Sequence, residues 1–175
     1  MKTIDLRSDA KTFRRELDRA VASLATESPG SISAIEVGYD CDQGGWIFIH
    51  ADRRAEHQRD GQWTAELDEK PLIKFPKWIE AQEANFEGEE IKVTELNGET
   101  FVVPGFDEDA DQDEEEIDPL VAAIGEMIHD VLMTAKSEGA FAPLAGLGPI
   151  QLDIEDFNGG WAWPEHDDLG EVNLV

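Results

Sequence analysis

The chain has 175 residues, of which 41% are hydrophobic, so it is long enough to form one domain with a real core. Forty acidic residues against 14 basic ones give a net charge of −26, which argues against direct binding to nucleic acids or anionic membranes. No stretch is apolar enough for a transmembrane helix, the start lacks the apolar run of a secretory signal, and a single cysteine excludes an intramolecular disulfide, so we expect a cytoplasmic protein.

The first 50 residues predict a helix followed by a β-hairpin. Ser8 is a suitable N-cap, and the apolar residues after it recur at helical spacing: Phe13, Leu17, Ala20, Val21 and Leu24. In residues 35–39 apolar side chains alternate with polar ones, which predicts a strand with Glu36 turned outward. The apolar run 46–49 follows a Gly-Gly turn and predicts the second strand of the hairpin.

The middle of the chain predicts two more hairpins and a helix. An Asp-Gly turn at 60–61 separates residues 52–58 from residues 63–67, which could form a hairpin. Pro76 suits the first turn of a helix that runs to about Asn85. Strands at 91–95 and 100–103 flank Asn97-Gly98, the residue pair preferred in type I′ turns.

Most of the negative charge lies in the second half of the chain. Residues 93–175 contain 21 acidic residues and a single base, Lys136. Nine of these acids fall within 107–118, so we expect 105–118 to be a mobile segment between 1–104 and 119–175, which together form one domain. Alternating aspartates in this segment are similar to the start of a calcium loop, but Gln112 stands where the turn needs glycine, so only weak divalent-cation binding is predicted.

The residues after the acidic segment predict a helix and a late strand. Asp118 is a suitable N-cap and Pro119 fits the first helical position, while Gly139 is a suitable stop. Alternating apolar residues from Ile150 to Ile154 predict the strand. The order of elements favours an α+β fold: an antiparallel sheet built from hairpins, with helices packed on one face.

Residues typical of catalysis or metal binding do not form a recognisable group. Cys41 stands between two aspartates, which raise the pKa of a thiol and make it a poor nucleophile, so a structural cysteine is the simpler interpretation. The four histidines lack the spacing of a zinc site, and no glycine-rich phosphate loop is present. We therefore expect no catalytic residue, no metal site and no cofactor.

Aromatic and acidic side chains near the C-terminus predict a surface for protein binding. Trp161 and Trp163 follow a glycine-rich turn, and aromatic residues are enriched at the centres of protein interfaces. Ordinary core positions are the alternative for these tryptophans. The acidic residues expected to contribute to partner binding are Asp153, Glu155 and Asp156, together with Glu126 and Asp130, which lie one helical turn apart.

The N-terminal elements also show a family resemblance. A leading helix, the strand with Ile35, Val37 and Tyr39, and the segment Gly44-Gly45-Trp46-Ile47-Phe48-Ile49 resemble small acidic bacterial immunity proteins of contact-dependent and polymorphic toxin systems. The resemblance implies a non-enzymatic inhibitor that docks and neutralises a basic protein partner. The second hypothesis is a DNA mimic that occupies a nucleic-acid-binding groove. The third is an uncharacterised enzyme or a weak divalent-cation binder.

Overall fold

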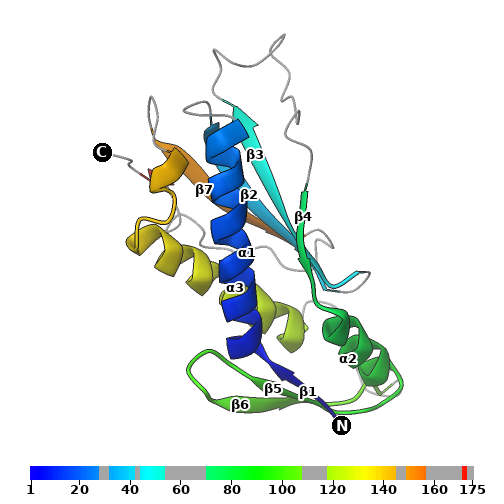
Figure 1. Cartoon of the computed structure of the whole chain (residues 1–175). Coiled ribbons are helices and arrows are strands. Elements are labelled where there is room, and N and C mark those ends of the chain that lie inside the picture. The colour runs from blue at the N-terminus through cyan, green and yellow to red at the C-terminus, as the bar shows by residue number, and fades with distance from the viewer. Residues whose placement is uncertain are drawn as a thin grey trace.

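In a computed structural model of the chain, the described residues form two β-sheets and three α-helices (Figure 1). The structure describes residues 1–27, 32–41, 44–53, 70–107, 118–144, 149–156 and 171–172. In chain order the elements are β1 (Lys2–Asp5), α1 (Leu6–Glu27), β2 (Ile32–Asp40), β3 (Trp46–Arg53), β4 (Lys70–Lys74), α2 (Pro76–Phe86), β5 (Ile91–Thr94), β6 (Thr100–Val103), α3 (Pro119–Ser137), the 3₁₀ turn η2 (Ala142–Leu144), β7 (Ile150–Asp156) and β8 (Glu171–Val172).

The larger sheet, sheet B, has the strand order β4-β3-β2-β7-β8. Its central strand β2 pairs antiparallel with β3, the next strand in the chain, and parallel with β7, which comes much later. The edges are completed by antiparallel pairing of β4 with β3 and of β8 with β7. Residues from both halves of the chain therefore share one sheet.

The smaller sheet, sheet A, lies at the N-terminal end of α1, next to α2 (Figure 1). Its strand order is β1-β5-β6, with β1 parallel to β5 and β5 antiparallel to β6. Pro76 occupies the first turn of α2, as predicted, because its missing N–H has no partner there in any helix. The side chains of Ile4, Ile91 and Val93 are buried and join sheet A to the common core.

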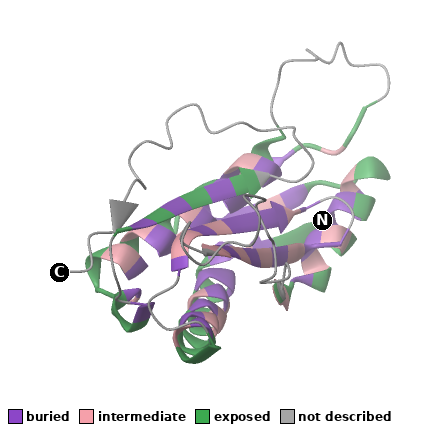
Figure 2. Ribbon diagram, turned by 90° about the horizontal axis from the view of Figure 1, so that it is seen from above, coloured by how far each residue is buried: buried purple, intermediate pink, exposed green. Residues whose placement is uncertain are grey.

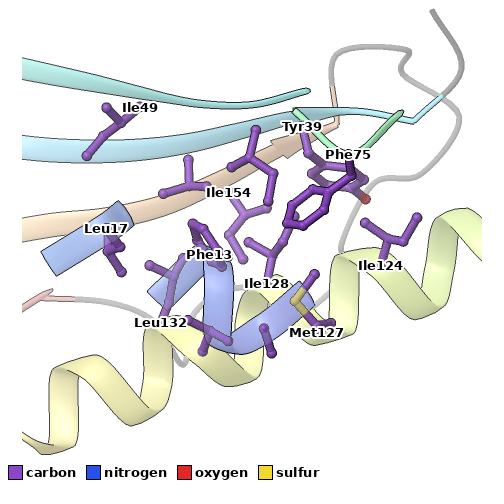
Figure 3. Close-up of a cluster of buried hydrophobic side chains, with 14 of the residues drawn as sticks. Phe13, Leu17, Tyr39, Ile49, Phe75, Ile124, Met127, Ile128, Leu132 and Ile154 are labelled. Carbon is purple, nitrogen blue, oxygen red and sulfur yellow. The ribbon is translucent and has the colours of Figure 1, made fainter. Parts of the chain in front are cut away.

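Helices α1 and α3 cover the same face of sheet B and bury their apolar sides against it (Figure 3). Phe13 and Leu17 of α1 meet Ile128 of α3 beneath the strands, and all three are fully buried. Figure 2 shows how buried positions follow the facing sides of helices and strands, while exposed positions lie on the outer sides. The apolar periodicity of both helices thus predicts which sides they bury.

The α+β class predicted from the sequence is confirmed, with additions. The fold has two sheets rather than one, and each contains a parallel pair besides its antiparallel pairs. The prediction of Ser8 as N-cap is wrong, because α1 begins at Leu6, directly after β1. The predicted cap of α3 is correct: the carboxylate of Asp118 accepts a hydrogen bond of 2.7 Å from the Leu120 amide.

The β5–β6 hairpin forms as predicted, but its turn differs from the predicted type I′ turn. The Gly98 amide donates to the Glu95 carbonyl at 3.0 Å, so Leu96 and Asn97 occupy the centre of the turn. Gly98 follows them with a φ of 89°, the left-handed region in which glycine is favoured. A turn closed by a left-handed glycine is the common arrangement for a three-residue hairpin loop. It also places Leu96 beside α1 and α3.

A buried carboxylate joins the first two helices. Asp9 in α1 is only 2% exposed. Its Oδ2 accepts a hydrogen bond of 2.9 Å from Trp78 Nε1, and its Oδ1 lies 2.6 Å from Lys77 Nζ, both on α2. Since a buried charge is tolerated only when it is paired and hydrogen-bonded, these contacts explain an acidic residue at this position.

Two further sequence expectations concern burial and membranes. Cys41 is buried at the end of β2, as expected for a structural cysteine. In the part of the chain that the structure describes, no helix combines the length and apolar character needed to cross a membrane. Most of the hairpin predicted at 52–58 and 63–67 lies outside the described residues, and residues 52 and 53 form the end of β3. Most of the acidic segment 105–118 also lies outside the described residues.

Candidate functional site

The face of sheet B that points away from α1 and α3 is covered by no helix among the described residues (Figure 1). Successive side chains of a strand point to opposite faces, so residues between the buried Ile35, Val37 and Tyr39 point outward. On β2 these include Glu36, and on β7 they include Asp153 and Glu155. This outer face therefore presents polar side chains from several neighbouring strands.

Four carboxylates on this face form an acidic patch, made of Glu36, Asp52, Asp153 and Glu155. The β-sheet register explains why they are close, because Glu36 lies directly opposite Asp153 on β7 and opposite His50 on β3. His50 Nδ1 is 3.8 Å from Glu36 Oε1. Among the described residues no lysine or arginine forms an ion pair with the acidic patch, and the basic side chain that approaches it is His50.

Crowding in the acidic patch changes the protonation of Glu36. Burial in the sheet raises the pKa of Glu36 to about 7, and the neighbouring Glu155, Asp153 and Asp52 add to the effect by charge repulsion. Glu36 also lies within hydrogen-bonding reach of Glu155, so the two carboxyls can share a proton. Burial raises the pKa of Asp52 as well, against the opposing effect of His50. Near neutral pH the patch therefore holds a proton that an approaching cation can displace.

Aromatic side chains lie beside the acidic patch on the same face. Trp46 and Phe48 of β3 are half-buried, and their ring centroids are 6.1 Å apart. Lys74 of β4 lies opposite Trp46 and places its Nζ 5.0 Å from the centre of the indole ring, a cation–π contact. Gly44 packs so closely on the Trp46 ring that a side chain there would overlap it. These contacts hold the aromatic surface in place next to the carboxylates.

The chemistry open to this face is binding of cations and transfer of protons. A carboxyl with a pKa near 7 is suited to proton exchange at neutral pH. Among the described residues, no group of three or more His, Cys, Asp or Glu side chains is placed to hold a metal ion.

The residues predicted for partner binding are divided between two surfaces. Asp153 and Glu155 lie in the acidic patch, and Asp156 ends β7, with only its backbone described. Glu126 and Asp130 project from α3, on the helical side of sheet B, where they line hollows beside Leu96. Trp161 and Trp163 lie outside the described residues. The structure therefore does not bring the five described acids into one site.

Sequence reasoning did not assign Glu36 or Trp46 to a binding surface on the outer face. The alternation in β2 did predict that Glu36 points outward. Its crowding could not be predicted, because Asp153 is more than a hundred residues away and is brought near only by the parallel pairing of β2 and β7. Glycines before Trp46 indicated a close approach, a signal that would have been sufficient to single out this tryptophan.

Comparison of the chain with protein-family models, with curated proteins and with solved structures finds no significant match.

Proposed function

We propose that the protein is an acidic binding module that docks a basic protein partner on the outer face of sheet B and so neutralises it. The observation that supports this most directly is the acidic patch, in which four carboxylates from three adjacent strands face outward without an ion pair to lysine or arginine among the described residues. Arginine or lysine side chains of a partner would relieve their mutual repulsion. In the complex, attraction to these basic side chains would then offset the unfavourable electrostatic energy of crowding the four acids.

The neighbouring aromatic residues supply the second component of a protein interface. Stable interfaces combine apolar or aromatic anchors with surrounding charges that steer association. Trp46 and Phe48 are adjacent to the patch, since Phe48 and Glu155 both lie opposite Gly38 of β2. A net charge of −26 would accelerate the approach of a basic partner and disfavour acidic ones.

The proposal is tested by neutralising the patch without changing its shape. The variant Glu36→Gln, Asp153→Asn, Glu155→Gln replaces three of the four carboxyl groups of the patch with neutral amides. A control variant, Glu80→Gln, Glu83→Gln, Glu87→Gln, makes the same number of replacements on the exposed side of α2 and at its C-cap. Proteins that the unmodified chain captures from a cell lysate are identified by mass spectrometry. The affinity of each captured protein for the unmodified chain, the patch variant and the control variant is then measured by calorimetry.

We expect a basic protein that binds the unmodified chain and the control variant equally well, but binds the patch variant about 100-fold more weakly, as removal of several interfacial charges predicts. The activity of that partner should be blocked by the unmodified chain and not by the patch variant. Equal weakening in both variants would mean that binding follows net charge alone, and this would contradict a site on sheet B. Failure to bind any basic protein would contradict the proposal itself.

A further inference from the structure

A second surface lies on the helical side of the molecule, between α1, α3 and the turn of the β5–β6 hairpin (Figure 1). We call it the helix–hairpin groove. It has a volume of about 540 Å³, and its floor is formed by apolar side chains from all three elements: Ala10, Leu96, Val131 and Met133. A smaller hollow of about 110 Å³ lies beside it and is lined by Met127 and Ala123 among others, and we count it as part of the helix–hairpin groove. The two hollows share Leu96 and Asp130.

Some charged side chains around the groove form ion pairs with described residues and others do not. Arg14 is occupied, because it forms ion pairs of 2.9 Å with Asp18 and 2.7 Å with Glu138. Glu95, Glu126 and Asp130 also line the two hollows, yet none of them pairs with a lysine or arginine in the described part of the chain. The nearest basic group to Asp130 is His129, with Nδ1 at 3.6 Å from its Oδ1.

Of the two described basic residues that line the larger hollow, Arg14 and Lys11, only Lys11 remains to oppose these acids. It lines the groove and forms no ion pair with any described residue. Three unneutralised carboxylates against one ammonium group leave the rim acidic, in a chain that is itself strongly acidic. Charge complementarity therefore favours a cationic occupant over an anionic one, while the floor requires that the occupant also have an apolar side.

The length of the groove agrees with a helical peptide. Taken together, the two hollows extend along α3 from Ala123 to Thr134, a rise of eleven residues or about 16 Å at 1.5 Å per residue. We propose that the helix–hairpin groove binds an amphipathic basic helix, whose apolar side chains contact Leu96 and Met133 and whose lysines or arginines pair with Glu126 and Asp130. Apolar residues spaced i, i+3, i+4 and i+7 would lie along the groove, the usual mode of helix-in-groove recognition.

This inference rests on the proposed function only for the sign of the partner's charge, since it concerns a different surface. The two are separable in experiment, because the acidic patch on sheet B and the groove share no residue. Neutralising Glu36, Asp153 and Glu155 should leave groove binding unchanged. Conversely, loss of the groove should leave any complex on sheet B intact.

Methionine labelling offers a direct readout, because the chain has three methionines and each reports on a different place. Met133 lines the groove, Met127 lines the smaller hollow, and Met1 is 69% exposed, with its amino group bound to Glu89 2.8 Å away. The full chain with ¹³C-methyl methionine is titrated at 150 mM NaCl with a 14-residue peptide that has leucines at helical spacing and lysines elsewhere. We expect a saturable shift of the Met133 methyl signal, a smaller one for Met127 and none for Met1.

Two variants separate groove binding from attraction to net charge. Leu96→Asp removes one apolar side chain from the floor and adds a negative charge, so it should weaken binding of the Lys–Leu peptide about tenfold, the effect of losing roughly 1.4 kcal/mol of apolar contact. Val102→Asp makes the same change of charge on the exposed side of β6, where Val102 is 50% exposed, and should leave the affinity unchanged. Circular dichroism of both variants checks that they fold.

Several results would overturn the proposal. Tighter binding by the Leu96→Asp variant, or an equal Met133 shift with a peptide in which serine replaces leucine, would show that charge alone is responsible. A shift produced by a peptide with glutamate in place of lysine would identify an anionic ligand at Lys11 instead. A Met133 signal that changes with protein concentration, without peptide, would identify a second copy of this chain as the occupant.

Discussion

Among the described charged residues, Asp9 is the one whose substitution should lower the free energy of unfolding most. Asp9→Ala leaves the buried Trp78 Nε1–H without an acceptor and Lys77 without its carboxylate. Because an unsatisfied buried donor and a broken ion pair both cost free energy, we expect the free energy of unfolding to fall by about 2–4 kcal/mol. Chemical denaturation measures the change.

A second variant separates the two contacts of Asp9. Asp9→Asn keeps an acceptor for the Trp78 indole but loses the charge that faces Lys77. Lys77 is 40% exposed and can turn to water, so this variant should lose less stability than Asp9→Ala. Equal losses in the two variants would mean that the hydrogen bond to Trp78 contributes nothing.

Glu36 should make the protein less stable as the pH rises. Its pKa is about 7 in the folded state against 4.5 for the free side chain, so the folded protein holds a proton that the unfolded chain releases between these values. The stabilising effect of this proton is present below pH 4.5 and is lost as the pH rises through 7. After allowance for partial exposure, we expect a loss of about 1–2 kcal/mol between pH 5 and 8.

The change attributable to Glu36 is isolated by Glu36→Gln, which keeps a neutral side chain of the same size. This variant should be more stable than the unmodified chain at pH 8, similar to it at pH 5, and its pH dependence over this interval should be weaker. Denaturation midpoints at several pH values provide the measurement. The pKa of Asp5, which hydrogen bonds from Arg7 lower to about 2, lies outside the interval and does not interfere. An unchanged slope would contradict the raised pKa of Glu36.

At the level of elements, the β5–β6 turn depends on the backbone of Gly98. A side chain at this position would meet only Arg7 Nη1, 3.9 Å away, so space is not limiting. The φ of 89°, however, is unfavourable for a β-branched residue. We expect Gly98→Val to reduce the free energy of unfolding by about 1–3 kcal/mol, measured by thermal or chemical denaturation.

Asparagine provides the matched control for this turn. It tolerates the left-handed region better than other residues, so Gly98→Asn should lose clearly less stability than Gly98→Val. Similar losses for asparagine and valine would indicate that the size of the side chain, and not the backbone conformation, determines the cost. Because Leu96 lies in the same turn, Gly98→Val should also disturb the helix–hairpin groove, whereas Gly98→Asn should preserve it.

Elements with strong local periodicity could be predicted from the sequence, whereas β1 could not. The apolar residues of α3 recur at helical spacing, and the predicted bounds agree with Pro119–Ser137. In contrast, β1 contains a single buried residue, Ile4, and its partner β5 lies more than 80 residues away. The start of α1 was misplaced for the same reason, since Leu6 follows a strand that no local pattern indicates.

At the level of the whole molecule, the arrangement of the strands was the least predictable feature. Hairpins are local, so the pairings β2–β3 and β5–β6 could be predicted from the chain. The parallel pairs β1–β5 and β2–β7 join distant segments, and nothing in either strand alone specifies its partner. The acidic patch forms only because β2 pairs with β7, which brings Glu36 opposite Asp153. Local sequence therefore indicated Asp153 and Glu155 as partner-binding residues, but it did not indicate their neighbour Glu36.

The central place of β2 also affects how the protein folds as it is synthesised. About 110 residues separate Asp40 at the end of β2 from Ile150 at the start of β7. At roughly 5–20 residues per second, the ribosome would need about 5–20 s to supply the second partner of β2. During that interval one edge of the central strand of sheet B would lack its neighbour, and an unpaired edge is a site for association with other chains. A nascent chain with this topology depends on late translation to complete its sheet, so premature termination would release an aggregation-prone fragment.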